Sequence, residues 1–284
     1  MEQTSLNREA KRVLHGLLLN LEEKLDADVL ALIGPILDGV EYKVRRVVEP
    51  LTPRRRKLAV VLHTEGGTVE VVERMVNILR NFYDEVLFVV PKFAMSAGTI
   101  FAMSGDAILM DYASYLGPID PQVVREGKLI PALSYLAQYE RLIAKSQNGV
   151  LSDAEFALLQ RLDLGELHQI EMAQELSKSL LVGWLAVYKF KDWTATQSAK
   201  RPVARQEREQ RAREIADALM DHTRWGSHGR GISMKTLRET LKLQIDDFGA
   251  DPTLSSIVQR YASLVLDFMD KNDISQLVHS REVF

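Results

Sequence analysis

The chain contains 284 residues, of which 46% are hydrophobic, so it can bury a substantial core and is not a disordered chain. Its formal net charge of -3 gives no general attraction to nucleic acid, which is therefore not expected as a partner. Cysteine is absent, which excludes disulfide scaffolds, cysteine nucleophiles and thiolate metal sites and leaves an oxygen or an amine as any nucleophile.

The first segment, residues 1–50, begins with a helical pattern. Apolar positions recur at helical spacing up to about residue 29 with acidic residues between them, unlike the basic-then-apolar layout of a secretory signal. The longest apolar stretch of the chain, residues 180–188, falls well short of the roughly 20 residues that span a bilayer. We therefore expect an N-terminal helix and a lead-in, in a cytoplasmic protein without a membrane span.

The second segment, residues 51–125, alternates between strands and helices. Residues 58–63 and 86–90 are apolar, β-branched and bounded by breakers, as buried strands are. Between them, residues 69–82 place their apolar side chains on one helical face. A helix over 94–103, entered through a tight turn, and a strand over 107–110 follow. This order predicts a mostly parallel sheet covered by helices, which is an α/β core.

The third segment, residues 126–284, is predominantly helical and is expected to extend the core. It also contains a glycine-rich turn at 225–232. The helical patterns in this segment cover residues 131–145, 152–160, 166–190, 207–221 and roughly 253–277.

Two short motifs within the core carry potential chemistry. HTEGG, residues 63–67, ends a strand with paired glycines, which let backbone N–H groups approach a ligand. AMSAGT, residues 94–99, places Ser96 at a helix start, where the amides that follow point toward its hydroxyl. Either motif alone is more often an ordinary turn or helix cap, but their order after successive strands favours one shared site. We expect Ser96 to attack a carbonyl while the N–H groups of Gly67 and Ala97 bind the oxyanion.

Residues 58–122, with HTEGG, AMSAGT, GDAILM and LGPIDPQ, resemble the serine dehydrogenase proteinase family. That family is related to signal peptide peptidase A and to the proteolytic subunit of Clp protease, within the Clp/crotonase superfamily. The resemblance implies a repeated ββα core with helical additions, and a serine peptidase that acts on peptides or unfolded proteins as a homo-oligomer. It assigns Ser96 as nucleophile and Gly66, Gly67 and Ala97 as the oxyanion hole.

The general base is open at this stage. A Clp-type histidine is expected after the third strand, but Asp120 and Gln122 occupy that stretch. A Ser–Lys dyad, as in signal peptide peptidase A, is the natural substitute, because a desolvated lysine can be neutral at working pH. Lys178 lies in a helical stretch that resembles the family, and Lys145 precedes a helix start similar to the one that follows the base of signal peptide peptidase A. The two lysines are equal candidates for the base.

His228 is a further candidate, in the WGSHGRGI segment at residues 225–232. The segment resembles a Trp-Thr-His-Asp stretch of the family. An imidazole titrates near neutrality, which suits a base, while the glycines around it are typical of a tight turn. His228 is therefore expected to act as a base, a substrate contact or a polar pin for the C-terminal segment.

One departure from the family pattern leaves other functions open. Glu65 stands where these families commonly have proline, and it brings a charge close to the expected oxyanion. The alternatives are a catalytically silent assembly or peptide-binding protein, and a crotonase-like acyl-CoA enzyme. No zinc-hydrolase spacing, Walker motif or dinucleotide-binding loop occurs in the sequence, so no metal or cofactor is expected.

Overall fold

A computed structural model describes residues 2–120, 122–125, 128–195 and 201–284, so Pro121 of the LGPIDPQ motif lies outside the described residues. The chain forms a six-stranded sheet with the order β10-β5-β3-β2-β1-β11. All neighbouring strands are parallel except β11, which runs antiparallel to β1. This confirms the predicted α/β architecture. The strands are β1 (Asp28–Ile33), β2 (Lys57–His63), β3 (Glu85–Val89), β5 (Ala107–Met110), β10 (Asp246–Asp247) and β11 (Leu277–His279).

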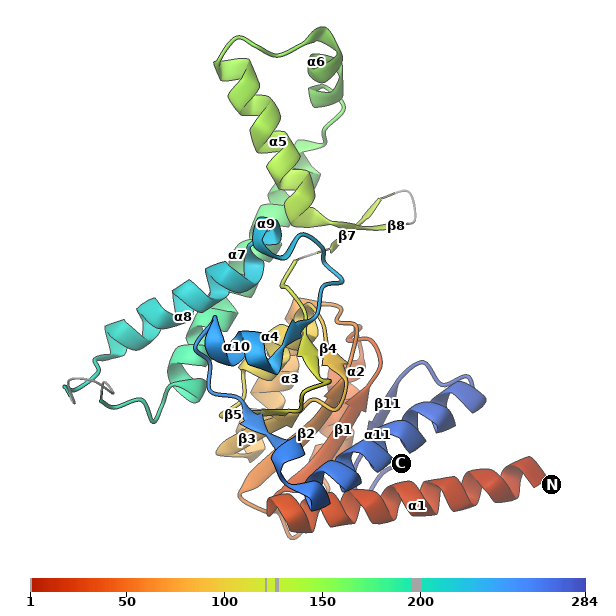
Figure 1. Cartoon of the computed structure of the whole chain (residues 1–284). Helices are drawn as coiled ribbons and strands as arrows, with labels where there is room; N and C mark the ends of the chain where they lie inside the picture. The colour runs from red at the N-terminus through yellow and green to blue at the C-terminus, as the bar shows by residue number, and fades with distance from the viewer. Residues whose placement is uncertain (1, 121, 126–127, 196–200) are drawn as a thin grey trace.

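Helices cover both faces of this sheet (Figure 1), which explains why its central strands read as continuous apolar runs. On one face lie α2 (Val40–Val48), α3 (Val69–Phe82) and α4 (Ala97–Met103), and on the other lie α1 (Glu2–Leu25) and α11 (Pro252–Lys271). Alternate residues of each strand enter the two layers, as the period-2 geometry of a strand requires.

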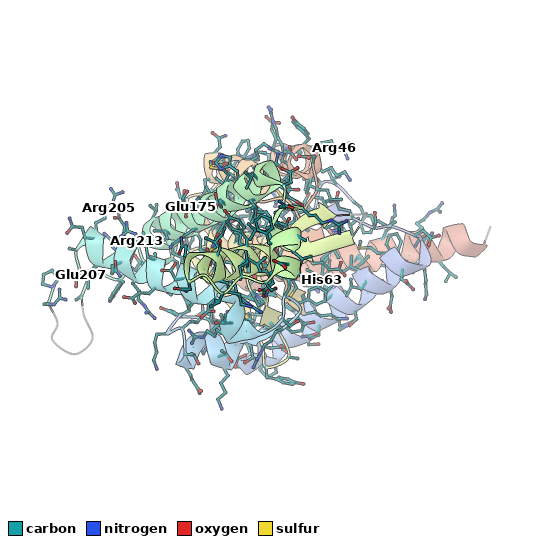
Figure 2. All side chains as sticks on the ribbon, turned by 90° about the horizontal axis from the view of Figure 1, so that it is seen from above. Arg46, His63, Glu175, Arg205, Glu207 and Arg213 are labelled. Carbon is teal, nitrogen blue, oxygen red and sulfur yellow. The ribbon has the colours of Figure 1, made fainter. Side chains whose placement is uncertain are left out.

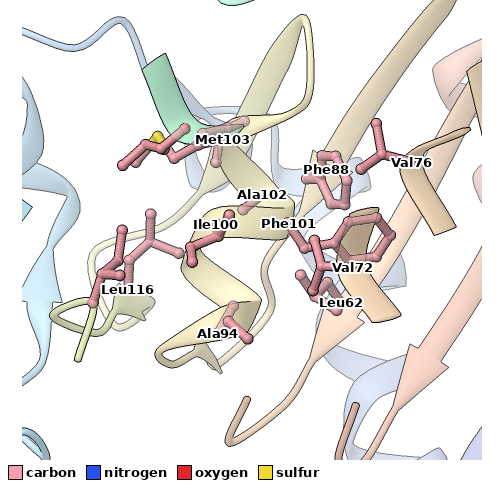
Figure 3. Close-up of a cluster of buried hydrophobic side chains, with 14 of the residues drawn as sticks. Leu62, Val72, Val76, Phe88, Ala94, Ile100, Phe101, Ala102, Met103 and Leu116 are labelled. Carbon is pink, nitrogen blue, oxygen red and sulfur yellow. The ribbon is translucent and has the colours of Figure 1, made fainter. Parts of the chain in front are cut away.

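The core beneath the candidate site is formed by α3, α4 and the sheet, as Figure 3 shows. Phe88 of β3 and Phe101 of α4 pack edge to face with ring centroids 4.8 Å apart. Leu62 of β2 and Val72 of α3 are fully buried in the same cluster. This packing holds the start of α4 against the end of β2, where the two motifs lie.

A second, three-stranded sheet lies beside the first and has the order β4-β6-β9. It consists of β4 (Phe93–Ala94), β6 (Tyr115–Leu116) and β9 (Ile232–Ser233), with β6 parallel to β4 and antiparallel to β9. Strand β9 directly follows the glycine-rich segment at 225–232. The second sheet therefore joins that distant segment to the AMSAGT motif.

The predicted helical extension is present, with several boundaries adjusted. An arm of α5 (Ala132–Gln147) and α6 (Asp153–Leu159) projects from the body in Figure 1, beyond the β7–β8 hairpin (Gln122–Arg125 and Lys128–Pro131). Helix α7 (Leu164–Trp184) continues into a π-helical segment, η1 (Leu185–Lys189), and packs against α8 (Arg205–Met220). The remaining short elements are α9 (His222–Trp225), α10 (Met234–Glu239) and the 3₁₀ turn η2 (Phe248–Ala250).

Two helix predictions were too long. The helix predicted over 94–103 begins at Ala97, because Phe93–Ala94 pairs with β6 as strand β4. The helix predicted over roughly 253–277 ends at Lys271, where Asp273 adopts a left-handed φ of 52° and the chain reverses into β11. Strands β1, β10 and β11 were not predicted, so the sheet draws on segments outside residues 51–125.

Candidate active site

The HTEGG and AMSAGT motifs are joined by backbone hydrogen bonds. Thr64 and Ala94 form an isolated parallel bridge, in which Thr64 N–H donates to Phe93 O (3.2 Å) and Met95 N–H donates to Thr64 O (2.9 Å). The Thr64 hydroxyl oxygen accepts from Gly66 N–H at 3.0 Å and so shapes the glycine turn. The two motifs therefore form one unit at the carboxyl end of β2.

The LGPIDPQ motif is attached to this unit through Thr99, which is fully buried. The Thr99 hydroxyl lies 2.9 Å from Ala94 O and 2.8 Å from Gly117 O, and it accepts a hydrogen bond from Gly117 N–H at 3.0 Å. All three predicted motifs thus meet around the start of α4.

Ser96 occupies a strained backbone position. Its φ of 51° and ψ of -117° are those of the first central residue of a type II′ turn, and Gly98 N–H donates to Met95 O at 2.7 Å to close the turn. Glycine normally fills this position, and a non-glycine residue there costs about 1–3 kcal/mol. The Ser96 side chain makes no helix cap, and its hydroxyl lies 3.4 Å from the carbonyl oxygen of Asp120. Ser96 is buried, and backbone strain of this kind is common at active sites.

Both positions of the glycine pair require glycine, because neighbouring atoms lie too close to admit a Cβ. Gly66 has a φ of 104°, and a Cβ there would lie 2.9 Å from Ser96 Cβ. Gly67 has a φ of 147°, and a Cβ there would lie 2.0 Å from the carbonyl oxygen of Ile36. No other residue type fits either position without movement of the backbone.

The backbone N–H groups at this site differ in whether they have a hydrogen-bond acceptor among the described residues. Ile36 N–H donates to Gly66 O and Thr68 N–H donates to Ile36 O, both at 2.8 Å. Within the described residues, the N–H groups of Gly67 and Ala97 have no hydrogen-bond partner. A pair of unoccupied backbone donors next to a serine can stabilise an oxyanion.

Asp120 contacts Ser96 through its carbonyl oxygen and lies next to His228 through its carboxylate. His228 Nδ1 lies 3.8 Å from Asp120 Oδ2, and the two side chains are 17% and 6% exposed. Burial lowers the pKa of His228 below its ordinary value of 6.5, although the negative charge of Asp120 opposes this shift. The segment that carries His228 is held by the pairing of Ile232 with Leu116, on the strand just before Asp120. No local sequence pattern marks Asp120 as a partner of His228, because their contact joins segments that are far apart in the chain.

The two predicted lysines lie elsewhere in the described chain. Lys145, on the α5–α6 arm, forms an ion pair with Glu155. Lys178 Nζ lies 2.6 Å from Asp217 Oδ1, between α7 and α8. Among the described residues, neither ammonium has a contact with Ser96.

A cavity of about 380 Å³ lies between α7 with η1 and α8. Glu175, Lys178, Arg205 and Arg213 are among its lining residues, and Figure 2 labels Glu175, Arg205 and Arg213 at the left of the view. No residue of the three motifs lines it, so this cavity is separate from the Ser96 site.

The described part of the chain has no features of a metal site or of a membrane span. It contains no group of three or more His, Cys, Asp or Glu residues that could hold a metal ion. It also has no helix that is both long and apolar enough to cross a membrane.

A family model described as ClpP-like SDH-type serine proteinase matches residues 36–183, just over half of the 284 residues. The matched span includes Ser96, both glycines of HTEGG and the two lysines, whereas His228 lies beyond it. The family match therefore covers the segment on which the predicted nucleophile and oxyanion hole lie.

Two uncharacterized proteins of Methanocaldococcus jannaschii are similar to this chain. MJ1495 is 29% identical over 141 residues, which is 47% of this chain and 47% of that protein. MJ0137 is 31% identical over 140 residues, which is 46% of this chain and 48% of that protein. The chain thus spans about half the length of the curated relatives it matches.

Among solved structures, a mutant of the 1510-N membrane-bound stomatin-specific protease is similar over 42% of this chain and 63% of that chain, with 19% identity and a TM-score of 0.33. A second mutant of that protease, in complex with a substrate peptide, is similar over 38% of this chain and 55% of that chain, with 21% identity and a TM-score of 0.33. At this level of similarity, neither structure bears on the chemistry of the present chain.

Proposed function

The chain belongs to the ClpP-like SDH-type serine proteinase family, and from this premise we propose that it hydrolyses peptide bonds with Ser96 as nucleophile. The observation that carries the proposal is the strained Ser96 turn, because it packs against the glycine turn at Gly66 and is adjacent to two amide donors that have no partner among the described residues. Peptides or unfolded chains are the proposed substrates, and a homo-oligomer is the proposed assembly.

In the proposed reaction, Ser96 Oγ attacks the scissile carbonyl carbon while its proton moves to a base. The N–H groups of Gly67 and Ala97 stabilise the oxyanion. The C–N bond then breaks, the amine leaves with the proton from the base, and an acyl-enzyme remains. Water attacks the ester, gives its proton to the same base, and releases the acid with regeneration of Ser96.

His228 with Asp120 is the base that the geometry supports best. Asp120 contacts both partners: its carbonyl oxygen lies 3.4 Å from Ser96 Oγ and its carboxylate lies 3.8 Å from His228 Nδ1. A proton on Nδ1 would face the carboxylate and leave Nε2 free to accept a proton. The lowered pKa of His228 keeps the imidazole neutral near pH 7, as a base requires. At 3.8 Å the two side chains form no hydrogen bond, so the proposal requires this distance to shorten when substrate binds, as catalytic hydrogen bonds often do.

The Ser–Lys alternative requires a rearrangement. Lys145 would first have to leave Glu155, and Lys178 would have to leave Asp217. A lysine from another copy of the chain would meet the same need in a homo-oligomer. The predicted lysine base therefore stays a prediction, and it is the second candidate for this role.

Labelling with a fluorophosphonate, read by intact mass, tests the proposal. Wild-type protein is expected to gain one adduct, and Ser96→Ala is expected to gain none. Because general-base catalysis contributes about 10²–10⁴ in rate, His228→Ala should slow labelling strongly, whereas Lys145→Ala and Lys178→Ala should not.

Far-UV circular dichroism of each variant controls for folding. A folded wild type that gains no adduct would contradict the assignment of Ser96. Slow labelling in one lysine variant, with normal labelling in His228→Ala, would transfer the role of base to that lysine.

A further inference from the structure

Glu65 is the charged residue closest in sequence to the oxyanion donors, and its side chain is directed outward. The residue is exposed, whereas Thr64 before it and Gly66 after it are buried. A Cβ on Gly66 would lie 2.9 Å from Ser96 Cβ, so the backbone of Glu65 is one residue from contact with the nucleophile. Within the described ranges, the Glu65 carboxylate has neither an ion pair nor a hydrogen bond.

This position creates an electrostatic problem for ordinary substrates. The reaction builds a negative charge on the oxyanion, and a carboxylate close to that charge raises its energy. A proline or an amide at the same place would not have this effect. A substrate with a cationic side chain beside the scissile bond removes the problem, because its charge pairs with Glu65 as the oxyanion forms.

No described cation forms an ion pair with Glu65. Arg74 is already held by two carboxylates, Asp38 at 2.8 Å and Glu41 at 2.9 Å. Lys92 is exposed on the approach to β4, where burial first and then the Lys92 charge lower the pKa of His63 to about 4. Lys92 therefore acts on His63, and in the described chain it forms no pair with Glu65.

We infer that Glu65 is a specificity-determining residue that selects substrates with lysine or arginine immediately before the scissile bond. This inference rests on the proposed function of Ser96. It predicts a preference for cationic over neutral side chains of the same length, and a loss of that preference when the charge of residue 65 is removed.

The test uses two peptidyl diphenyl phosphonates that differ only in the residue before phosphorus, lysine in one and the uncharged, unbranched norleucine in the other. Rates of adduct formation at Ser96 are measured by intact mass for wild type, Glu65→Gln and Glu70→Gln. Glu70 is a matched control, since it is also exposed and lies in the first turn of α3 rather than in the glycine turn. A small uncharged fluorophosphonate reports the reactivity of Ser96 independently of specificity.

Wild type is expected to react roughly tenfold faster with the lysine probe, as expected for one charge pair close to the surface. Glu65→Gln should bring the ratio near one, mainly because norleucine labelling becomes faster, and Glu70→Gln should keep the wild-type ratio. Equal rates for both probes in wild type, or the same ratio in Glu65→Gln, would overturn this inference while Ser96 stays reactive. If neither the phosphonates nor the small reagent labels folded protein, the proposed function fails and this inference fails with it.

Discussion

The contact between Thr64 and Gly98 gives a sharp test of how the two motifs fit together. A Cβ on Gly98 would lie 2.4 Å from Thr64 Cγ2, and Thr64 is 1% exposed. In Gly98→Ala, overpacking of this kind costs about 1–3 kcal/mol. Alanine in place of glycine within a helix returns about 0.5–1 kcal/mol. The net expectation is a loss of about 0.5–2 kcal/mol in the free energy of unfolding.

Thr64→Ser removes the clashing methyl group but keeps the hydroxyl that accepts from Gly66 N–H. Alone it should cost about 1 kcal/mol, as for loss of one buried methyl group. In the double variant the clash is gone while the helical gain of alanine remains, so it should be at least as stable as Thr64→Ser alone. The cycle therefore predicts a favourable coupling of about 1–3 kcal/mol.

Urea midpoints of the four proteins, followed by circular dichroism, measure this coupling. The m-values should agree, because the surface exposed on unfolding is unchanged. If Gly98→Ala lowers the free energy of unfolding equally in wild type and in the Thr64→Ser variant, the steric explanation of the contact between the motifs is wrong.

Three further outcomes follow from the same structure. Ser96→Gly should be more stable than Ser96→Ala by about 1–2 kcal/mol in urea unfolding, because glycine relieves the strain at a φ of 51° and loses only part of that gain to its flexibility in the unfolded chain; both variants should lose labelling. The acid limb of the pH profile of kcat/KM should lie below pH 6.5, since burial lowers the pKa of His228. Asp120→Asn should move this limb to still lower pH, because it removes the charge that stabilises the imidazolium. Burial lowers the pKa of His279 from 6.5 to about 3, so the stability that the protein has above pH 6.5 is lost as the pH falls. The loss should be about 2 kcal/mol at pH 5, and His279→Gln should flatten this dependence in urea titrations.

The parallel core was predictable because its signals are local. Residues 58–62 are apolar at every position, and the next helix repeats its apolar residues at helical spacing, so each element carries its own pattern. Ser96 and the glycine pair were recognisable for a similar reason, since each motif follows a buried strand. The closeness of the motifs then follows from the geometry of parallel strands.

The contributions of distant segments were not predictable in this way. Strand β11 has only three residues, and it joins the sheet through its antiparallel pairing with β1. His228 is brought next to Asp120 by the two-residue strand β9, which has no periodicity to detect. Partners of this kind are set by tertiary packing, and a single sequence does not reveal them.

The order of the site residues along the chain also bears on the synthesis of the protein. Ser96 and the two proposed oxyanion donors, Gly67 and Ala97, are made early, whereas His228 and strand β11 are made late. At about 5–20 residues per second, a ribosome needs roughly 7–26 s to proceed from Ser96 to His228. A nascent chain in this interval holds the proposed nucleophile without its proposed base, and strand β1 has not yet paired with β11. If the proposed function holds, the peptidase would become active only when the C-terminal segment completes the sheet.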